Sequence, residues 1–89
     1  MPTIHLLIKG KVQGVFYRAT AKKIAQKLEV TGWIKNTKDG NVEAAATGNE
    51  EHLKEFINWC KQGPDNAKVE EVIVEQNQKT LFNTFEITR

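Results

Sequence analysis

Apolar residues recur along this chain with two different periods, one typical of strands and one typical of helices, in successive segments. Ile4, Leu6 and Ile8 are spaced by two, which predicts a strand with one buried face. Other apolar residues recur at intervals of three and four, which predicts amphipathic helices. The pattern predicts strands at 3–8, 30–35, 42–46, 69–74 and 82–88, and helices at 21–28 and between a cap at Asn49 and a break at Gly63-Pro64.

The order of these elements is strand, helix, strand, strand, helix, strand, with a further short strand expected at an edge. This order is typical of the split βαβ unit, so we expect an α+β, ferredoxin-like two-layer sandwich (βαββαβ) with two helices on one face of the sheet. No internal repeat, low-complexity segment or linker interrupts the 89 residues. A single domain over residues 1–89 is therefore expected.

In this topology the first two strands run parallel, and the third strand lies between them. Their carboxyl ends then reach the same edge of the sheet, two strand spacings or roughly 10 Å apart. The first strand leads into a loop at 10–18, and the second ends near Asn36. We expect this loop and Asn36 to face each other across a gap that an arginine side chain can span.

The loop has the composition of an anion site. Gly10 and Gly14 allow tight turns and close approach of the backbone to a ligand, and N–H groups at the start of the next helix favour phosphate. Arg18 adds a planar, permanently charged group that binds two phosphate oxygens at once. The only other arginine is Arg89, the last residue. The sequence favours phosphoryl chemistry here, although a glycine loop before a helix is most often only a tight connection.

Composition limits the classes of partner. The net charge is +2 and the lysines are interspersed with glutamates, whereas nucleic-acid binders usually concentrate basic residues on one face. Cys60 is the single cysteine, so no intramolecular disulfide is possible. No apolar run approaches the roughly 20 residues that cross a bilayer, and the N-terminus lacks the pattern of a signal peptide. We expect a soluble, cytoplasmic monomer that binds neither nucleic acid nor membranes.

Two ordered motifs resemble those of the acylphosphatase family. The loop signature of that family, Gly-x-Val-Gln-Gly-Val-x-Phe-Arg, is matched by Gly10, Val12, Gln13, Gly14, Val15 and Arg18. A second signature, from Gly-Trp through Asn to Asp-Gly and Val, is matched by Gly32, Trp33, Asn36, Asp39, Gly40 and Val42, and a weaker third pattern by Gly63, Pro64, Ala67 and Val69. Tyr17 stands where the family usually has phenylalanine, which adds a hydroxyl next to Arg18. Two motifs in the right order are far more specific than either alone.

The resemblance implies hydrolysis of acyl phosphates to a carboxylate and inorganic phosphate, without metal, cofactor or covalent intermediate. By position, Arg18 and Asn36 take the catalytic roles. Arg18 and the backbone N–H groups of the loop would hold the phosphoryl oxygens, and Asn36 would orient the attacking water, because an asparagine is a poor general base. The residues implied in substrate binding are Gln13, Gly14, Val15, Phe16, Tyr17 and Arg18.

Other candidate sites receive little support from the sequence. His5 lies within a strand and His52 near the start of a helix, with no carboxylate partner implied, so we expect structural or surface roles for both. Cys60 completes an apolar helical stripe and is expected to be a buried, inert thiol. Neither a P-loop nor a metal-ligand spacing is found.

Two other classes of function are alternatives to the hydrolase. RNA-recognition domains share this topology but carry aromatic residues on the open face of the sheet, whereas here the first strand is aliphatic and the third is rich in alanine. A non-catalytic sensor of phosphate or a small metabolite would use the same loop without positioning a water. Asn36 distinguishes the sensor from the hydrolase, because only the hydrolase needs it.

Overall fold

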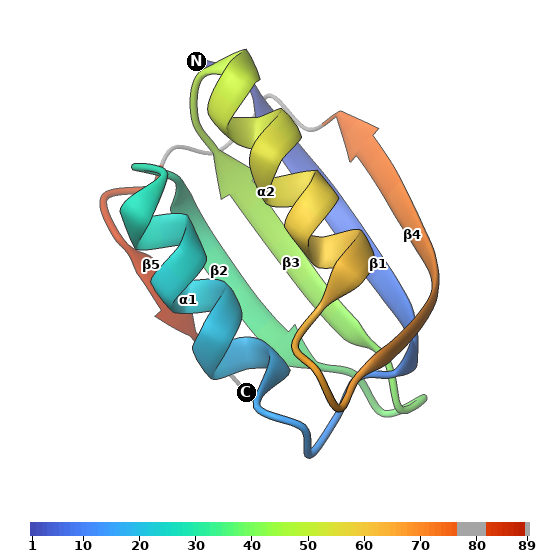
Figure 1. Ribbon diagram of the computed structural model, residues 1–89. Coiled ribbons are helices and arrows are strands. Elements are labelled where there is room, and N and C mark those ends of the chain that lie inside the picture. The colour runs from blue at the N-terminus through green and yellow to red at the C-terminus, as the bar shows by residue number, and fades with distance from the viewer. Residues whose placement is uncertain (77–81, 89) are drawn as a thin grey trace.

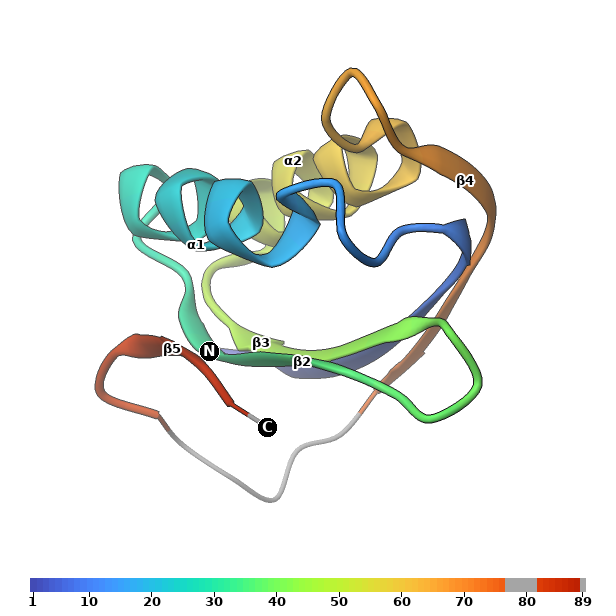
Figure 2. The ribbon, with the colours of Figure 1, turned by 90° about the horizontal axis from the view of Figure 1, so that it is seen from below.

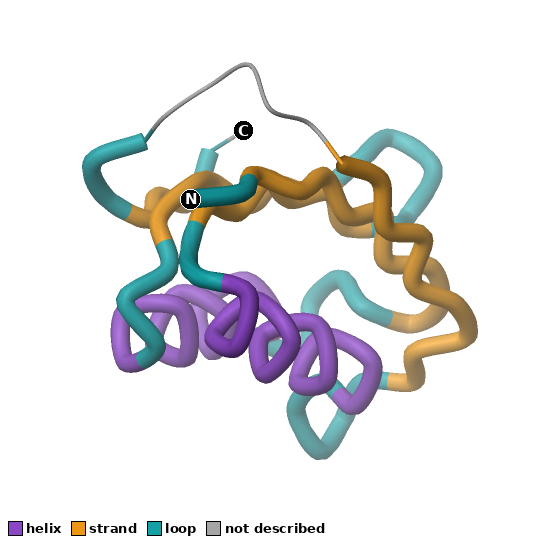
Figure 3. The backbone as a smooth tube through the Cα atoms, turned by 90° about the horizontal axis from the view of Figure 1, so that it is seen from above, coloured by secondary structure: helices purple, strands orange, loops and turns teal. Residues whose placement is uncertain are grey.

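The computed structural model describes residues 1–76 and 82–88, and its elements form two layers (Figure 1). The sheet contains β1 (Thr3–Lys11), β2 (Thr31–Asn36), β3 (Val42–Thr47), β4 (Lys68–Gln76) and β5 (Phe85–Ile87), in the order β4-β1-β3-β2-β5. The helices are α1 (Tyr17–Lys27) and α2 (Glu50–Gln62), and Figure 2 and Figure 3 show both on the same side of the sheet. The predicted ferredoxin-like sandwich, with a fifth strand at an edge, is confirmed.

The register of the sheet sets where the strands end. β3 lies antiparallel between β1 and β2, so these two strands run parallel without pairing directly. Val42 of β3 pairs with Ile8 on one side and with Asn36 on the other. The carboxyl ends of β1 and β2 therefore lie at the same end of the sheet, the lower end in Figure 1, where the loop to α1 also lies.

The core lies between the sheet and the two helices. Leu6 and Ile34 of the sheet are fully buried, and the ring of Phe56 on α2 meets that of Phe85 on β5 edge-on, with centroids 5.7 Å apart. Burying a side chain of this size contributes about 1.5–3 kcal/mol. The apolar stripes predicted for the helices are confirmed, since Ala21, Ala25, Leu53, Phe56 and Cys60 are buried and Ile24, Leu28 and Ile57 pack against them. Neither helix in the described residues is long and apolar enough to cross a membrane.

Tyr17 joins the first turn of α1 to the end of α2. Its side chain is buried beside Trp59, and its hydroxyl donates a 2.7 Å hydrogen bond to the backbone carbonyl of Cys60. Within a helix that carbonyl would accept from the residue four positions further on, but this residue is Pro64, which has no N–H. The tyrosine hydroxyl therefore replaces a missing helical hydrogen bond.

Burial also keeps two titratable groups neutral in this region. Desolvation raises the pKa of the Tyr17 hydroxyl well above its ordinary value, and it raises the pKa of the Cys60 thiol to about 12. The thiol of Cys60 is fully buried and free. The expected burial of the thiol is confirmed.

Three elements, β1, α1 and β5, differ most from the predicted ranges. β1 continues through Gly10 to Lys11, because a bulge between Lys9 and Gly10, where Gly10 has φ of 128°, lets the strand stay paired with β4. α1 begins at Tyr17 instead of 21, so Arg18 lies in the first helical turn and the connecting loop is only 12–16. β5 covers three residues, and 82–84 lie outside it.

Replacing Tyr17 by phenylalanine tests the hydrogen bond to Cys60. Phenylalanine is the usual residue at this position in the family that the sequence motifs resemble. We expect Tyr17→Phe to lower the free energy of unfolding by about 1–2 kcal/mol, because it leaves a buried carbonyl without a donor. Tyr17→Leu also removes the ring next to Trp59 and should lose about 3 kcal/mol in total. Urea unfolding followed by tryptophan fluorescence measures both values. A Tyr17→Phe variant as stable as the native chain would mean that the hydroxyl contributes nothing.

Candidate functional site

A cavity of about 280 Å³ opens at the end of the sheet where β1 and β2 terminate. Arg18 reaches it from the first turn of α1, and Asn36 reaches it as the last residue of β2. The cavity is lined by Val12, Gly14, Phe16, Tyr17, Arg18, Ala19, Asn36 and Ile87. The expectation that the loop and Asn36 face each other is confirmed, because the topology delivers both to one edge.

Two residues of the loop next to this cavity have left-handed backbone conformations. Gly14 has φ of 73° and Phe16, the N-cap of α1, has φ of 61° and ψ of 23°. Left-handed residues that alternate with ordinary ones turn successive N–H groups toward a common concavity, which attracts anions. No side chain caps α1, and its first turn carries no acidic residue. The positive end of the helix is therefore available to an anion.

The guanidinium of Arg18 and the side-chain oxygen of Asn36 both lack a protein partner within the described residues. The ion pairs found there join Glu43 to His5 and to Lys35, and none involves the guanidinium of Arg18. The Oδ1 of Asn36 is buried and accepts no hydrogen bond in the described part of the chain. An unpaired buried acceptor costs about 1–3 kcal/mol.

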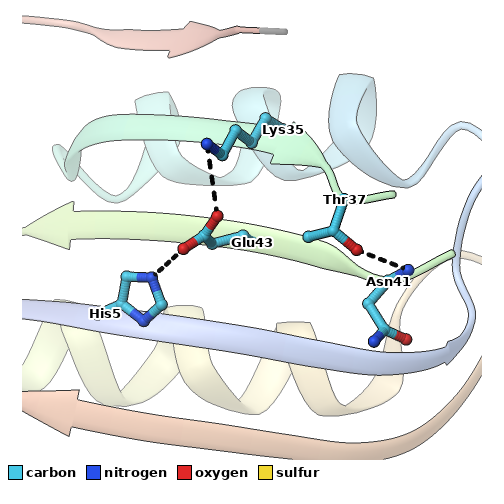
Figure 4. A network of polar contacts seen from close by, with 5 residues as sticks. All are labelled: His5, Lys35, Thr37, Asn41 and Glu43. Carbon is cyan, nitrogen blue, oxygen red and sulfur yellow. Dashed lines mark hydrogen bonds and ion pairs between the residues drawn. The ribbon is translucent and has the colours of Figure 1, made fainter. Parts of the chain in front are cut away.

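The side chain of Gln13 ties the loop to the β2–β3 hairpin. Its Nε2 donates two hydrogen bonds of 2.8 Å, one to the carbonyl of Thr37 and one to the carbonyl of Asn41. The hairpin is closed further by the N–H of Thr37, which donates to the carbonyl of Asn41, and by the N–H of Asn41, which donates to Thr37 Oγ1 (Figure 4). Thr37 directly follows Asn36, so Gln13 fixes the position of Asn36 relative to the loop.

The side chains of the other loop residues divide between the core and the solvent. The sequence suggested that the Tyr17 hydroxyl would lie next to Arg18, and this is wrong, because the first helical turn directs it into the core toward Cys60. The side chain of Val15 is also buried in the core, so Val15 contributes only its backbone to the loop surface. Phe16 is 79% exposed. Sequence spacing did not reveal this division, because it depends on where the helix begins.

A second group of polar side chains lies on the face of the sheet opposite the helices (Figure 4). His5 Nε2 and Glu43 Oε2 are 2.6 Å apart, and Lys35 Nζ lies 3.5 Å from Glu43 Oε1 and 5.3 Å from the centre of the Trp33 ring. The hydrogen bond from His5 lowers the pKa of Glu43 below its ordinary value, and the positive charge of Lys35 adds to the effect.

The sequence implied no carboxylate partner for His5, but the structure supplies one. The partner, Glu43, comes from the neighbouring strand β3, so only the register of the sheet could have revealed it. His52 donates its backbone N–H to Oδ1 of Asn49 at 2.8 Å, which confirms the predicted cap of α2. Over residues 1–76 and 82–88, no three His, Cys, Asp or Glu side chains are grouped so that they could hold a metal ion.

Comparison with known proteins places the chain in a family. A sequence model of the acylphosphatase family matches residues 4–87. An acylphosphatase of Marinobacter nauticus is 45% identical over 85 residues, which cover 94% of this chain and 92% of that protein. The crystal structure of the acylphosphatase from Bacillus subtilis has a TM-score of 0.96 at 32% identity, covering 100% of both chains. An acylphosphatase from Coxiella burnetii has a TM-score of 0.94 at 36% identity, covering 98% of this chain and 92% of that one. The chain belongs to the acylphosphatase family of enzymes.

Proposed function

We propose that this chain hydrolyses acyl phosphates at the cavity between Arg18 and Asn36, giving a carboxylate and inorganic phosphate. The observation that carries the proposal is the meeting of two side chains in one cavity, an arginine and an asparagine. Within residues 1–76 and 82–88, the arginine has no ion-pair partner and the buried oxygen of the asparagine accepts no hydrogen bond. The uncapped start of α1 next to them supplies further donors for an anion.

In this reaction Arg18 and the N–H groups of the loop hold the phosphoryl oxygens. The water oxygen forms a bond to phosphorus while the bond from phosphorus to the acyl oxygen breaks, and the electron pair of that bond leaves with the carboxylate. Negative charge spreads over the phosphoryl oxygens in the transition state, so fixed donors aimed at them supply most of the catalysis. The guanidinium binds two of these oxygens together, and the backbone donors need no reorganisation during the reaction.

Asn36 positions the attacking water through its side-chain amide. The amide orients the water by hydrogen bonding, so that a lone pair of the water points toward phosphorus. The amide does not take up the proton, which passes to a phosphate oxygen or to solvent. The leaving carboxylate has a low pKa, so it departs without a general acid. A site with one arginine, one asparagine and backbone donors is therefore sufficient, with no metal or cofactor.

Asn36→Ala separates this hydrolase from a phosphate sensor. We expect kcat for benzoyl phosphate to fall about 100-fold or more, because one preorganised polar group is lost from the transition state. Asn36→Asp keeps the size but brings a negative charge to the phosphate, and its loss should be at least as large. Hydrolysis is followed by ultraviolet absorbance in the presence of a metal chelator. Asn83→Ala, which removes an exposed asparagine just before β5, at the other end of β2 from Asn36, is the control. An Asn36→Ala rate within a few-fold of native would exclude the assigned role.

Arg18→Lys tests whether geometry or charge matters at the phosphoryl group. We expect it to be nearly as damaging as Arg18→Ala, because an ammonium group cannot donate two parallel hydrogen bonds in a fixed plane. Lys23→Ala removes a positive charge from an exposed position of the same helix and is the control. The measurement is kcat and KM for benzoyl phosphate, with circular dichroism to verify folding. Recovery of substrate affinity by Arg18→Lys would show that charge alone suffices.

Gln13→Ala tests the link between the loop and the hairpin. Loss of two hydrogen bonds should lower kcat about 10-fold with a smaller change in KM, because Asn36 is then less well positioned, and stability should fall by about 1–2 kcal/mol. Gln13→Glu keeps the shape but turns a carboxylate toward two carbonyl oxygens, so it should be at least as damaging at neutral pH. Steady-state kinetics and urea unfolding give both quantities. A loss of stability with unchanged kcat would make Gln13 purely structural.

A further inference from the structure

Phe16 is a large apolar side chain placed in water at the edge of the catalytic cavity. Among the described residues, the large hydrophobic side chains that are exposed are Met1, Phe16, Val74 and Ile87. Phe16, at 79% exposure, and Ile87, at 41%, come from opposite ends of the chain, yet both line the same cavity with Val12. An aromatic ring in water gains nothing from the hydrophobic effect, so folding does not explain its place here.

The backbone at Phe16 adds a second observation. Its φ of 61° and ψ of 23° lie in the left-handed region, which a bulky residue rarely adopts and which costs folding free energy. Glycine would take this conformation without that cost. A phenylalanine is therefore held in an unfavourable backbone conformation while its ring remains in solvent next to the cavity.

The orientation of the substrate follows from where its phosphoryl group binds. With the phosphoryl group on Arg18 and the N–H groups of the loop, the bond to the acyl oxygen points away from these donors, since the water approaches from the opposite side, in line with that bond. The acyl group then lies at the mouth of the cavity. The apolar walls there come from Phe16 at the start of α1 and Ile87 at the end of β5, two elements that Figure 1 shows side by side.

We infer that Phe16 and Ile87 form an apolar subsite for the acyl group and that they favour acyl phosphates with aromatic acyl groups over those with small ones. This inference rests on the proposed function for its substrate class. An aromatic ring stacks on Phe16 and contacts Ile87, whereas an acetyl group is too small to cover either side chain. The contact is equal in the ground and transition states, so it acts on KM more than on kcat.

The test compares benzoyl phosphate with acetyl phosphate on the native chain and its variants. For Phe16→Ala, the ratio of kcat/KM for benzoyl phosphate to that for acetyl phosphate should fall about 5- to 10-fold, mainly through KM for benzoyl phosphate. Ile87→Ala should lower the ratio by about threefold. Phe16→Leu should retain part of it. Val74→Ala, which removes an exposed apolar side chain from β4, should leave it unchanged. An unchanged ratio in Phe16→Ala would overturn the inference.

Phe16→Gly distinguishes the contribution of the ring from that of the backbone conformation. Glycine accepts the left-handed conformation, so if Phe16 acted only by holding the loop, Phe16→Gly would keep the native ratio, and that result would overturn the inference. If the native chain hydrolyses neither substrate, the proposed function fails. The apolar subsite is then tested separately, by measuring the binding of two phosphate esters. Titration with phenyl phosphate and methyl phosphate should then show tighter binding of phenyl phosphate that Phe16→Ala abolishes. Equal affinity for the two phosphates would contradict the inferred apolar subsite as well.

Discussion

The insertion of β3 between β1 and β2 is the constraint on which the site depends. Two antiparallel pairings in succession make β1 and β2 parallel, and the shared partner Val42 holds Ile8 and Asn36 in register across three strands. The loop that leaves β1 and the residue that ends β2 are therefore brought to one edge by backbone hydrogen bonds alone. Gln13 then sets their separation more finely, through two hydrogen bonds from a single amide group to the hairpin. The topology of the sheet brings the loop and Asn36 to the same edge, and the side chain of Gln13 sets their relative position.

The fold was predictable because most of its local signals agree. The alternation of Ile4, Leu6 and Ile8, the cap at Asn49 and the break at Gly63 each indicate one structure, and the structure contains all of them. The errors fall where a local signal depends on a partner elsewhere in the chain. The glycine at position 10 suggested a loop, but β4 supplies a bulged pairing that keeps it in a strand. The start of α1 was placed too late because the loop was extended to Arg18 and the apolar period was counted from Ala21, whereas the ring of Tyr17 is already buried against α2.

The candidate site was predictable in its members but not in how they act. Arg18 and Asn36 could be brought together from topology, because the sheet edge where strands end does not depend on side-chain packing. The use of the Gln13 amide and the exposure of Phe16 depend on the φ values of the loop and on the first residue of α1, which no periodicity encodes. The pairing of His5 with Glu43 likewise requires the register of β1 against β3. What the sequence left open is the set of contacts between segments that are distant along the chain.

Unfavourable features are concentrated at one end of a structure that is otherwise locally consistent. The oxygen of Asn36 and the guanidinium of Arg18, which have no partner in the part of the chain that the structure describes, border one cavity with the uncapped start of α1 and the left-handed Phe16. An unsatisfied acceptor and a strained backbone each cost about 1–3 kcal/mol, which is a substantial part of the stability of a domain of this size. The fully buried core between the two helices and the sheet supplies the stability that makes these costs tolerable. Groups that a protein leaves unsatisfied at one place are satisfied by what binds there. For an anion with an attached acyl group, the N–H groups and Arg18 match the charge, and Phe16 with Ile87 matches the apolar remainder.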